Sequence, residues 1–164
     1  MTEITTCLWL SHPADVVDEA LAFYCELIPG SSITSRDQVG PAESPTVLAD
    51  VVLAGTPYRV IGAPVDFSLN PSVSLSVSCA DQAEVDRYWD ALTADGGQES
   101  QCGWLVDRWG LSWQIVPTRL VELVSDPDPG RSRRATAAML RMRRIVIAEL
   151  EAAASDSASE VGQG

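Results

Sequence analysis

Apolar and polar residues follow the same order in two halves of the chain, which predicts two copies of one structural unit. In the first half, an apolar run over residues 4–10 predicts a strand. Apolar residues at helical spacing then predict a helix that begins near Pro13 and ends at Pro29-Gly30. Three more strands are expected, over residues 33–39, 46–53 and 58–62. The first half is therefore predicted to be β-α-β-β-β.

The second half repeats this order about 66 residues later, as the step from Asp15 to Asp81 shows. Apolar residues alternate with serine over 73–79, which predicts a half-buried strand. Asp81 and Glu84 have the spacing of a capping box, and Gly96-Gly97 ends the helix that follows. Three strands are then expected, near residues 98–101, 104–107 and 111–116. The predicted fold is α+β: two βαβββ modules forming a curved, cup-like mixed sheet with helices outside.

The last two of these strands form a hairpin with two different faces. Leu111, Trp113 and Ile115 share one face. Ser112, Gln114 and Val116 share the other, and Pro117 should end the strand because it has no N–H. The pattern predicts one face packed on a helix and one face open to a cavity.

After the hairpin, helical patterns replace strand patterns. A short helix is expected over 118–124, a turn over 125–130 and a second helix with a narrow apolar stripe, which a third helical piece over 145–150 extends. The stripe consists of Ala135, Ala138, Met139 and Met142. The predicted organisation is a paired βαβββ domain over 1–120, a C-terminal helical appendage over 121–152 and a disordered tail over 153–164.

The charge of the chain is −12, and its uneven distribution matters more than its sum. Residues 1–130 hold 19 acids and 5 arginines, whereas residues 131–148 hold 6 arginines and no acid. An acidic body argues against nucleic-acid binding. The basic segment suggests self-association or docking of one part on the other; the alternative is a helix whose arginines face water.

Two further features bear on the expected compartment. No apolar run approaches the roughly 20 residues of a membrane span, and no signal peptide is visible, so no membrane partner is expected and the protein should be cytoplasmic. The four cysteines are widely spaced, which predicts free thiols.

The stretch Gln101–Pro117 reads Gln-Cys-Gly-Trp-Leu-Val-Asp-Arg-Trp-Gly-Leu-Ser-Trp-Gln-Ile-Val-Pro. Following two βαβββ units, it closely resembles the PhnB-like branch of the vicinal oxygen chelate (VOC) superfamily, which includes glyoxalase I, ring-cleaving dioxygenases and bleomycin-resistance proteins. The resemblance covers about residues 4–153 and includes Ile4–Trp9, Phe23-Tyr24 and Asp126–Pro129. It implies a homodimer, because units of this superfamily often pair between chains. Members often carry a ubiquinone-pathway methyltransferase label, which no glycine-rich turn after a strand supports here.

The resemblance also locates the positions at which relatives hold a divalent ion, which are four inward-facing strand positions, two per unit. The last of these falls on Gln114, the first near Thr5, and another near Ser72 or Ser74. The strand over 58–62 offers no carboxylate or imidazole. One amide with hydroxyls is a poor site for Zn²⁺, Fe²⁺ or Ni²⁺. Neither a metal nor another cofactor is therefore expected.

Candidates for catalysis are few. His12 is the only histidine, and it lies in a loop at a helix start, so no His-containing nucleophile pair is available. Asp107 and Arg108 lie at the hairpin turn, which is structural in the relatives. No catalytic residue is assigned.

The predicted pocket has eight inward-facing candidates: Thr5, Cys7, Trp9, Ser74, Ser76, Cys102, Ser112 and Gln114. Aromatic, hydroxyl and amide groups suit holding a flat or amphipathic organic molecule better than breaking its bonds. The expected function is binding of a small organic molecule in a metal-free cup, with toxic cationic compounds as candidates. Two alternatives stay open: a metal-dependent VOC-type enzyme (lyase, isomerase or dioxygenase-like) with a ligand set around Gln114, and a non-catalytic dimeric interaction protein using the arginine-rich segment 131–144.

Overall fold

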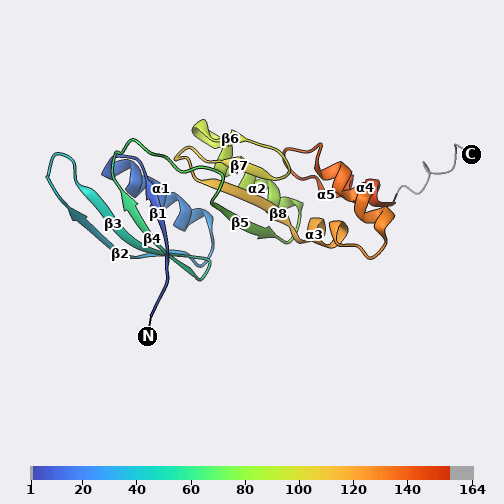
Figure 1. Cartoon of the computed structure of the whole chain (residues 1–164), viewed down its shortest axis with the longest axis horizontal. Coiled ribbons are helices and arrows are strands. Elements are labelled where there is room, and N and C mark those ends of the chain that lie inside the picture. Colours follow the sequence, from blue (N-terminus) through green and yellow to red (C-terminus); the bar gives the residue numbers. More distant parts are fainter. Residues whose placement is uncertain (1, 156–164) are drawn as a thin grey trace, which may run out of the picture. The chain divides into compact units, whose positions relative to one another are not determined.

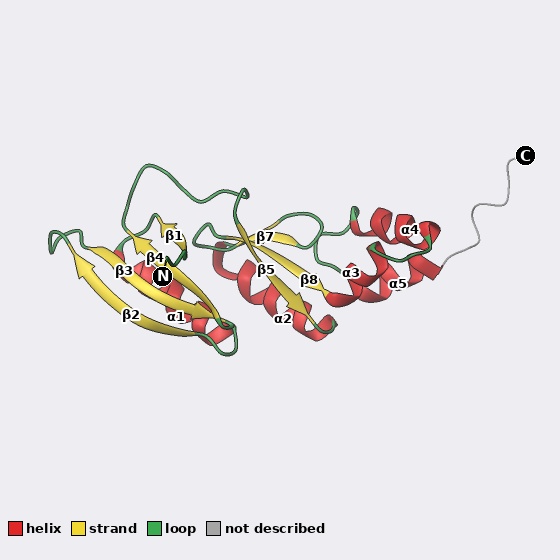
Figure 2. Ribbon diagram, turned by 60° about the horizontal axis from the view of Figure 1, so that its bottom comes forward, coloured by secondary structure: helices red, strands yellow, loops and turns green. Residues whose placement is uncertain are grey.

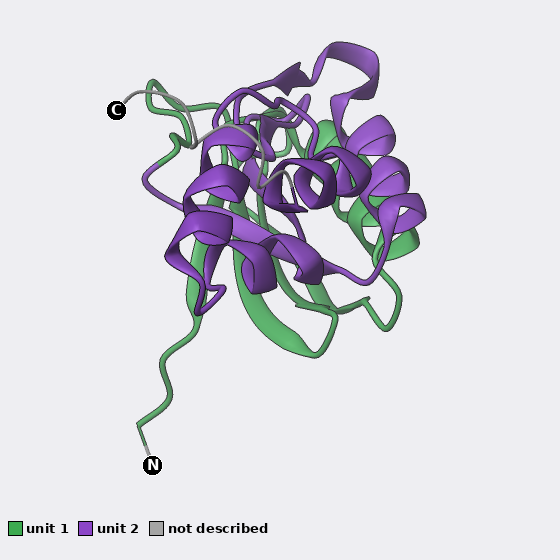
Figure 3. Ribbon diagram, turned by 90° about the vertical axis from the view of Figure 1, so that its right-hand side faces the viewer, with its two compact units in different colours: residues 1–71 green, residues 72–164 purple. Residues whose placement is uncertain are grey.

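The computed structural model describes residues 2–155. The chain divides into two compact units, residues 1–71 and 72–164, which Figure 3 shows in different colours. Each unit holds one mixed four-stranded sheet and a helix in the order β-α-β-β-β, and three further helices follow in the second unit. The predicted α+β class, the duplicated βαβββ unit and the C-terminal helices are confirmed. No helix within residues 2–155 is both long and apolar enough to cross a membrane.

The first unit consists of β1 (Thr6–Leu10), α1 (Ala14–Leu27), β2 (Ser32–Val39), β3 (Thr46–Leu53) and β4 (Thr56–Gly62) (Figure 1). The strands lie in the order β1-β4-β3-β2. β1 runs parallel to β4, and the other neighbours are antiparallel. The strands therefore correspond closely to the predicted ranges.

The core of the first unit forms between α1 and one face of its sheet. The helix contributes the buried residues Val17, Ala20, Leu21 and Tyr24, and β3 contributes the alternating residues Val47, Ala49, Val51 and Leu53. A Cβ atom at Gly62 would lie 2.5 Å from Cγ2 of Val17, so only glycine allows the helix this close to β4. The opposite face of the sheet carries the other residues of each strand.

The second unit begins with β5 (Ser74–Cys79), α2 (Gln82–Thr93), a 3₁₀ turn (Ala94–Gly96), β6 (Gln98–Glu99), β7 (Trp104–Val106) and β8 (Ser112–Pro117). The strand order is β5-β8-β7-β6, with β5 parallel to β8. The predicted cap at Asp81 is present, because Asp81 Oδ1 accepts a hydrogen bond from Glu84 N at 2.9 Å, and Glu84 Oε2 accepts one from Ala80 N at 2.8 Å. Pro117, expected to stop the strand, is its last residue and pairs with Cys79.

Helix α2 lies along one face of this second sheet, as Figure 2 shows. The core between them includes the fully buried residues Val85, Trp89, Leu92, Leu105, Leu111, Trp113 and Ile115. Trp89 Nε1 donates to Glu99 Oε1 at 2.8 Å, which ties the helix to the short strand β6. The period-two pattern of the hairpin therefore placed the apolar face of β8 correctly.

The C-terminal helices α3 (Thr118–Val124), α4 (Pro129–Met139) and α5 (Ile147–Ser155) form a cluster of their own within the second unit. Its buried residues are Leu120, Leu123, Ala135, Ala138, Met142, Ile145, Leu150 and Ala154. The helix α5 continues to Ser155, so the positions 153–155 of the expected tail are helical. The rest of that tail, 156–164, lies outside the described residues.

A short segment after α4, residues 142–147, ends on the first residue of α5 and fastens this cluster to the rest of the second unit; we call it the strap. Cys102 N donates to Met142 O and Gly103 N to Arg143 O, both at 2.8 Å. Gln82 of α2 binds both sides of the strap, donating to Ile145 O at 3.1 Å and accepting from Ile147 N at 2.9 Å. The C-terminal helices are therefore part of the second unit's hydrogen-bonded structure.

The arginines of the basic segment are largely engaged inside the second unit. Arg144 binds Asp86 and Asp90 of α2, and Arg143 lies 3.6 Å from Glu99. Arg134 donates to the carbonyl oxygens of Ala153 and Ala154, and Arg131 pairs with Asp126 at 3.4 Å. Of the three possibilities drawn from the charge pattern, these contacts favour docking, with Arg131, Arg143 and Arg144 on acidic residues of their own unit.

Candidate functional site

The face of the second sheet opposite α2 brings together four of the eight predicted pocket residues. Ser74 and Ser76 of β5 pair in register with Ser112 and Gln114 of β8. Gln114 Nε2 donates a hydrogen bond to Ser74 Oγ at 2.8 Å. These four side chains share one face because residues two apart in a strand point the same way.

The four residues differ in their access to solvent. Ser76 is exposed, and Ser74 and Gln114 are half-buried. Ser112 is only 1% exposed, and within residues 2–155 its hydroxyl has no hydrogen-bond partner. Such an orphaned polar group is uncommon in a folded chain and calls for an explanation.

The face that carries these residues is neutral. Trp104 lies directly opposite Gln114 in the register of β7 and β8, and Val106 lies opposite Ser112. Every strand position on this face, as far as the described chain goes, is uncharged: Ser74, Ser76, Ser78, Gln98, Trp104, Val106, Ser112, Gln114 and Val116. These strand positions thus offer hydrogen-bond donors and acceptors beside an indole ring, and none of them carries a charged side chain.

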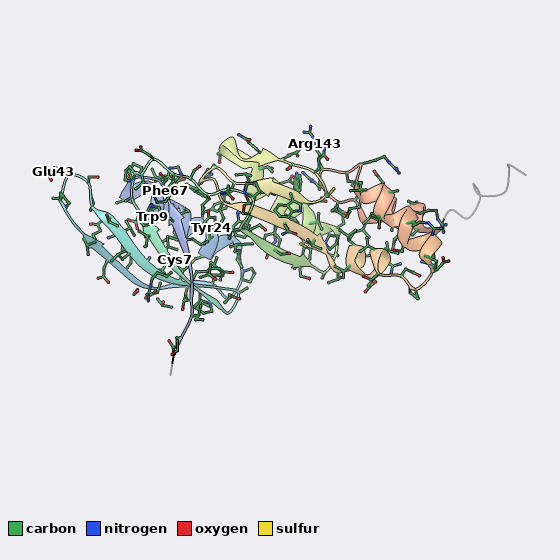
Figure 4. The ribbon with its side chains drawn as sticks, viewed as in Figure 1. Cys7, Trp9, Tyr24, Glu43, Phe67 and Arg143 are labelled. Atoms are coloured by element: carbon green, nitrogen blue, oxygen red, sulfur yellow. The ribbon has the colours of Figure 1, made fainter. Side chains whose placement is uncertain are left out.

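The predicted residues of the first unit lie around β1. Thr5 directly precedes the strand, and with Cys7 and Arg59 it lines a hollow of about 430 Å³, completed by Glu3 and Ile4. Trp9 lies farther along the strand, where its ring packs edge-on against Phe67 with centroids 5.2 Å apart (Figure 4). Trp9 Nε1 donates to Ala63 O at 3.4 Å. The structure therefore brings Thr5 and Cys7 into one hollow and holds Trp9 with the segment after β4.

An ion pair lies on the face of the first sheet that carries Cys7. The sequence did not predict that its two residues lie side by side. Asp50 Oδ1 accepts from Arg59 Nε at 3.0 Å, and Asp50 Oδ2 accepts from Ser35 Oγ at 3.1 Å. The hydrogen bond from Arg59, and after it the one from Ser35, lowers the pKa of Asp50. The hydrogen bond to Asp50 in turn raises the pKa of Arg59. Only the strand register could have revealed this ion pair, since Asp50 lies opposite Arg59, and Arg59 lies opposite Cys7. Strand boundaries alone do not reveal it.

Cys102 does not lie on a strand. It occupies the loop between β6 and β7 with φ of 58°, and its backbone N–H is bound by the strap. The predicted strand over 98–101 ends at Glu99, so the chain turns before Cys102 and re-enters the sheet at Trp104. Trp104 is the residue next to Gln114 that the prediction missed.

Asp107 and Arg108 have structural roles at the hairpin turn, as expected. Asp107 is buried, and its Oδ1 accepts hydrogen bonds from the backbone N–H groups of Trp109 and Leu111 at 2.9 and 3.0 Å. Arg108 lies over the ring of Trp109 and pairs with Asp95 at 2.9 Å. Both side chains therefore serve the geometry of the turn.

Potential metal ligands are dispersed. Residues 2–155 contain no group of three or more His, Cys, Asp or Glu side chains placed to hold an ion. The groups nearest to Gln114 are hydroxyls and an indole, which are poor ligands for transition metals. The four cysteines are free thiols, and Cys79 is buried.

Comparison with known proteins identifies the family. Residues 2–116 match the family described as 3-demethylubiquinone-9 3-methyltransferase. The PhnB protein from Bacillus cereus is 30% identical, with a TM-score of 0.63 over 71% of this chain and 100% of that chain. Protein PA1353 from Pseudomonas aeruginosa is 19% identical, with a TM-score of 0.56 over 71% of this chain and 98% of its own.

A third structure shares the fold at lower identity. The fosfomycin resistance protein FosX from Listeria monocytogenes is 10% identical, with a TM-score of 0.54 over 74% of this chain and 94% of that chain. No curated protein sequence matches the chain. The hairpin motif, the paired βαβββ order and these matches agree: the chain belongs to the 3-demethylubiquinone-9 3-methyltransferase family, a PhnB-like family of the VOC superfamily.

Proposed function

We propose that the chain binds a small organic molecule against the neutral face of the second sheet, without a metal ion. The observation that carries this proposal is the hydrogen bond from Gln114 to Ser74, which orients an amide in the middle of a face of hydroxyls. Small-molecule sites combine apolar and aromatic walls with a few fixed polar groups, and this face has that composition.

The family description names a methyl transfer, but the features of the chain favour binding. Gly96 has φ of 113° and ends the turn after α2, so the Gly96-Gly97 pair is a helix stop. Neither sheet is the open parallel sheet, with a glycine-rich turn after its first strand, that binds dinucleotides. The fold therefore adds no support to the methyltransferase description.

The charge distribution favours a cationic ligand. Residues 1–130 hold 19 acids against 5 arginines. The six arginines of residues 131–148 offset part of this excess, and the whole chain keeps a net charge of −12. A net negative protein attracts cations and speeds their association at low salt. We therefore expect aromatic, positively charged compounds, including glycopeptides of the bleomycin type, as the first ligands to test.

Isothermal titration calorimetry with these compounds tests the proposal. Binding is expected for the wild-type chain, with a several-fold loss for Gln114→Ala. The matched control is Gln101→Ala, which removes the same amide from an exposed loop position. No heat from any cationic or aromatic compound would refute the proposed function, and equal losses in both variants would refute the role of Gln114.

A metal-dependent enzyme is the second candidate. The observation that favours it is a structural neighbour: a mutant of FosX from Listeria monocytogenes, crystallised with Mn(II) and a dihydroxypropylphosphonic acid, has a TM-score of 0.50. Elemental analysis after loading with Mn²⁺, Zn²⁺, Fe²⁺ or Ni²⁺ separates the candidates. A stoichiometric ion that is lost in Gln114→Ala would replace the metal-free proposal with this one.

Two properties of the whole protein belong to the same proposal. We expect a homodimer in the cytoplasm, where its four free cysteines stay reduced. Light scattering coupled to size-exclusion chromatography checks the dimer. The third candidate, an interaction protein working through segment 131–144, is weakened because most of that segment's arginines already have partners within the second unit.

A further inference from the structure

The thiol of Cys7 lies in a hollow of the first unit, where a small molecule can reach it. Of the four cysteines, Cys7 is exposed, Cys25 and Cys102 are half-buried and Cys79 is buried. The hollow has a volume of about 430 Å³, and its other lining residues are Glu3, Ile4, Thr5 and Arg59. A reagent that reacts with this thiol in the native protein therefore meets a carboxylate, a hydroxyl and a guanidinium beside it.

The strand register places Arg59 next to Cys7. The two residues are partners in the parallel pair of β1 and β4, so their side chains point to the same face of the first sheet. Leu8, the next residue of β1, is buried on the other face. The pKa of Arg59 is raised first by its hydrogen bond to Asp50 and, to a smaller extent, by the thiol of Cys7. The thiol and the guanidinium are therefore close enough to interact.

The guanidinium of Arg59 keeps hydrogen-bond donors available to a ligand. Its Nε donates to Asp50 Oδ1 at 3.0 Å, and the side chain is 60% exposed. Within residues 2–155 no group accepts a hydrogen bond from its two terminal amino groups. Two parallel N–H groups of a guanidinium match the two oxygens of a carboxylate. Arg59 can therefore bind a carboxylate in the hollow without releasing Asp50.

Glu3 brings the opposite charge to the same hollow. It precedes β1 and is exposed, and as far as the described chain goes its carboxylate has no ion-pair partner. Beside the thiol, the hollow thus offers an acceptor for an ammonium group and donors for a carboxylate. A molecule that carries both charges, as an α-amino acid does, can satisfy both side chains, whereas a singly charged molecule leaves one of them unmatched.

We propose that Cys7 is a site of reversible modification by small amino-acid disulfides, whose carboxylate Arg59 binds and whose ammonium group Glu3 binds. The Cys7 thiolate attacks one sulfur of the disulfide, the S–S bond of the reagent breaks, and a new S–S bond joins Cys7 Sγ to that half. The other half leaves with the electron pair and takes up the proton that Cys7 released, so Cys7 is oxidised and the leaving half is reduced. A thiol reductant reverses the step. This inference concerns the first unit and does not depend on the ligand proposed for the second.

Mass spectrometry of the native protein treated with cystine tests the site. Peptide mapping at successive times gives the rate at each cysteine. We expect one half-cystine to be added at Cys7 before any other cysteine reacts, and Cys7→Ser to remove this first addition. A first addition at Cys25 or Cys102, or none in the native protein, would overturn the proposal.

Three disulfides of nearly the same shape test the roles of the two charged side chains. Cystine carries an ammonium and a carboxylate on each half, cystamine carries only the ammonium, and dithiodipropionate carries only the carboxylate. Arg59→Gln should slow the reaction of Cys7 with cystine and dithiodipropionate by about 2- to 5-fold more than that with cystamine. Glu3→Gln should slow cystine and cystamine by a similar factor relative to dithiodipropionate. Comparing variants with one reagent at a time cancels the different intrinsic reactivities of the three disulfides.

Two control variants separate direct contact from the general effect of charge. Arg36→Gln removes an arginine of the same unit that pairs with Asp18 and does not line the hollow. Glu43→Gln removes an exposed carboxylate outside the hollow. Neither should change the rate with cystine. Equal slowing of all three reagents by Arg59→Gln, or effects of the same size in the controls, would overturn the recognition of amino-acid disulfides by Arg59 and Glu3.

Discussion

Asp107 and Trp113 are joined by a buried hydrogen bond, 2.8 Å from Trp113 Nε1 to Asp107 Oδ2, which closes the β7–β8 hairpin across its turn. The other carboxylate oxygen of Asp107 holds the backbone of the turn. One side chain therefore fixes both the turn and the indole at the centre of the second unit's core. The strand that carries Ser112 and Gln114 begins directly after this turn, so its register depends on the same carboxylate.

Replacing Asp107 by asparagine should destabilise the chain by about 2–4 kcal/mol, because an amide placed here turns an N–H donor toward another donor and loses charge-assisted bonds. Chemical denaturation measures the change. The matched control is Asp95→Asn, at an exposed carboxylate that pairs with Arg108, where the loss should stay below about 0.5 kcal/mol. Similar losses at both positions would contradict the role of Asp107.

Trp113→Ala should cost about 3–5 kcal/mol, because the indole is buried and the cavity left behind cannot close fully. Trp113→Phe keeps most of the packing and removes only the N–H, so a smaller loss is expected. The comparison of the two variants by denaturant unfolding divides the effect into packing and hydrogen bonding.

Gln114→Ala should change the free energy of unfolding by less than about 1 kcal/mol, because the side chain is half-buried and makes one hydrogen bond to another side chain. A loss above roughly 2 kcal/mol would show that Gln114 serves the core rather than a ligand. The measurement is made without ligand, so that stability and binding are read separately.

Gln82→Ala should release the strap. The variant removes two hydrogen bonds to the strap, at Ile145 and Ile147, and should cost about 1–3 kcal/mol. Hydrogen exchange is expected to quicken across residues 142–155, while the sheet of the first unit keeps its protection. Gln101→Ala, at an exposed position, is the control. Uniformly faster exchange over both units would argue that Gln82 supports the whole chain and not the strap.

The pH dependence of α4 follows from its cap. Hydrogen bonds from the backbone N–H groups of Gly130 and then Arg131 lower the pKa of Asp128 below its ordinary value of 3.8. A carboxyl with a depressed folded pKa adds stability above its unfolded pKa, and this is lost as pH falls through the folded value. Asp128→Ala should therefore have a lower Tm than the wild type near pH 6. The difference should shrink below pH 3.8, and a constant difference down to pH 2 would contradict the cap.

The thiols offer a further test. Burial raises the pKa of Cys79 from 9.0 to about 11, because the thiolate is poorly solvated there. At pH 8 about 0.1% of this thiol is ionised, so Cys79 should react with a disulfide reagent only after unfolding. Exposed Cys7 should react in the native protein. The raised pKa favours the folded state below pH 9.0 and ceases to do so as pH rises through about 11.

Local patterns predicted most of the fold. Helical spacing placed α1, the Asp81 and Glu84 pair placed the start of α2, and alternation in β8 assigned Trp113 to the core and Gln114 to the other face. These signals work because they depend on residues within a few positions of each other. The cluster of Ser74, Ser76, Ser112 and Gln114 followed from the same alternation.

What could not be predicted depends on distant backbone contacts, on strand register and on packing. Cys102 lies outside the sheet, where its backbone N–H donates to Met142 O in the distant strap. The Asp50–Arg59 pair required the register of β3 and β4, which no strand boundary fixes. The burial of Ser112 depends on the packing of its neighbours. The alternation of apolar and polar residues in β8 places Ser112 on the polar face, but it does not reveal that neighbouring side chains exclude water from this serine.

The hydrogen bond between Gln82 and Ile147 spans 65 positions, so the second unit can complete its structure only late in synthesis, after the first. Every strand and helix of the first unit has been synthesised by residue 71, whereas the second waits for its last helix. Until then the nascent chain displays Leu120 and Val116 without the helices that cover them. A premature stop codon near position 120 would therefore produce an aggregation-prone fragment rather than a shorter working protein.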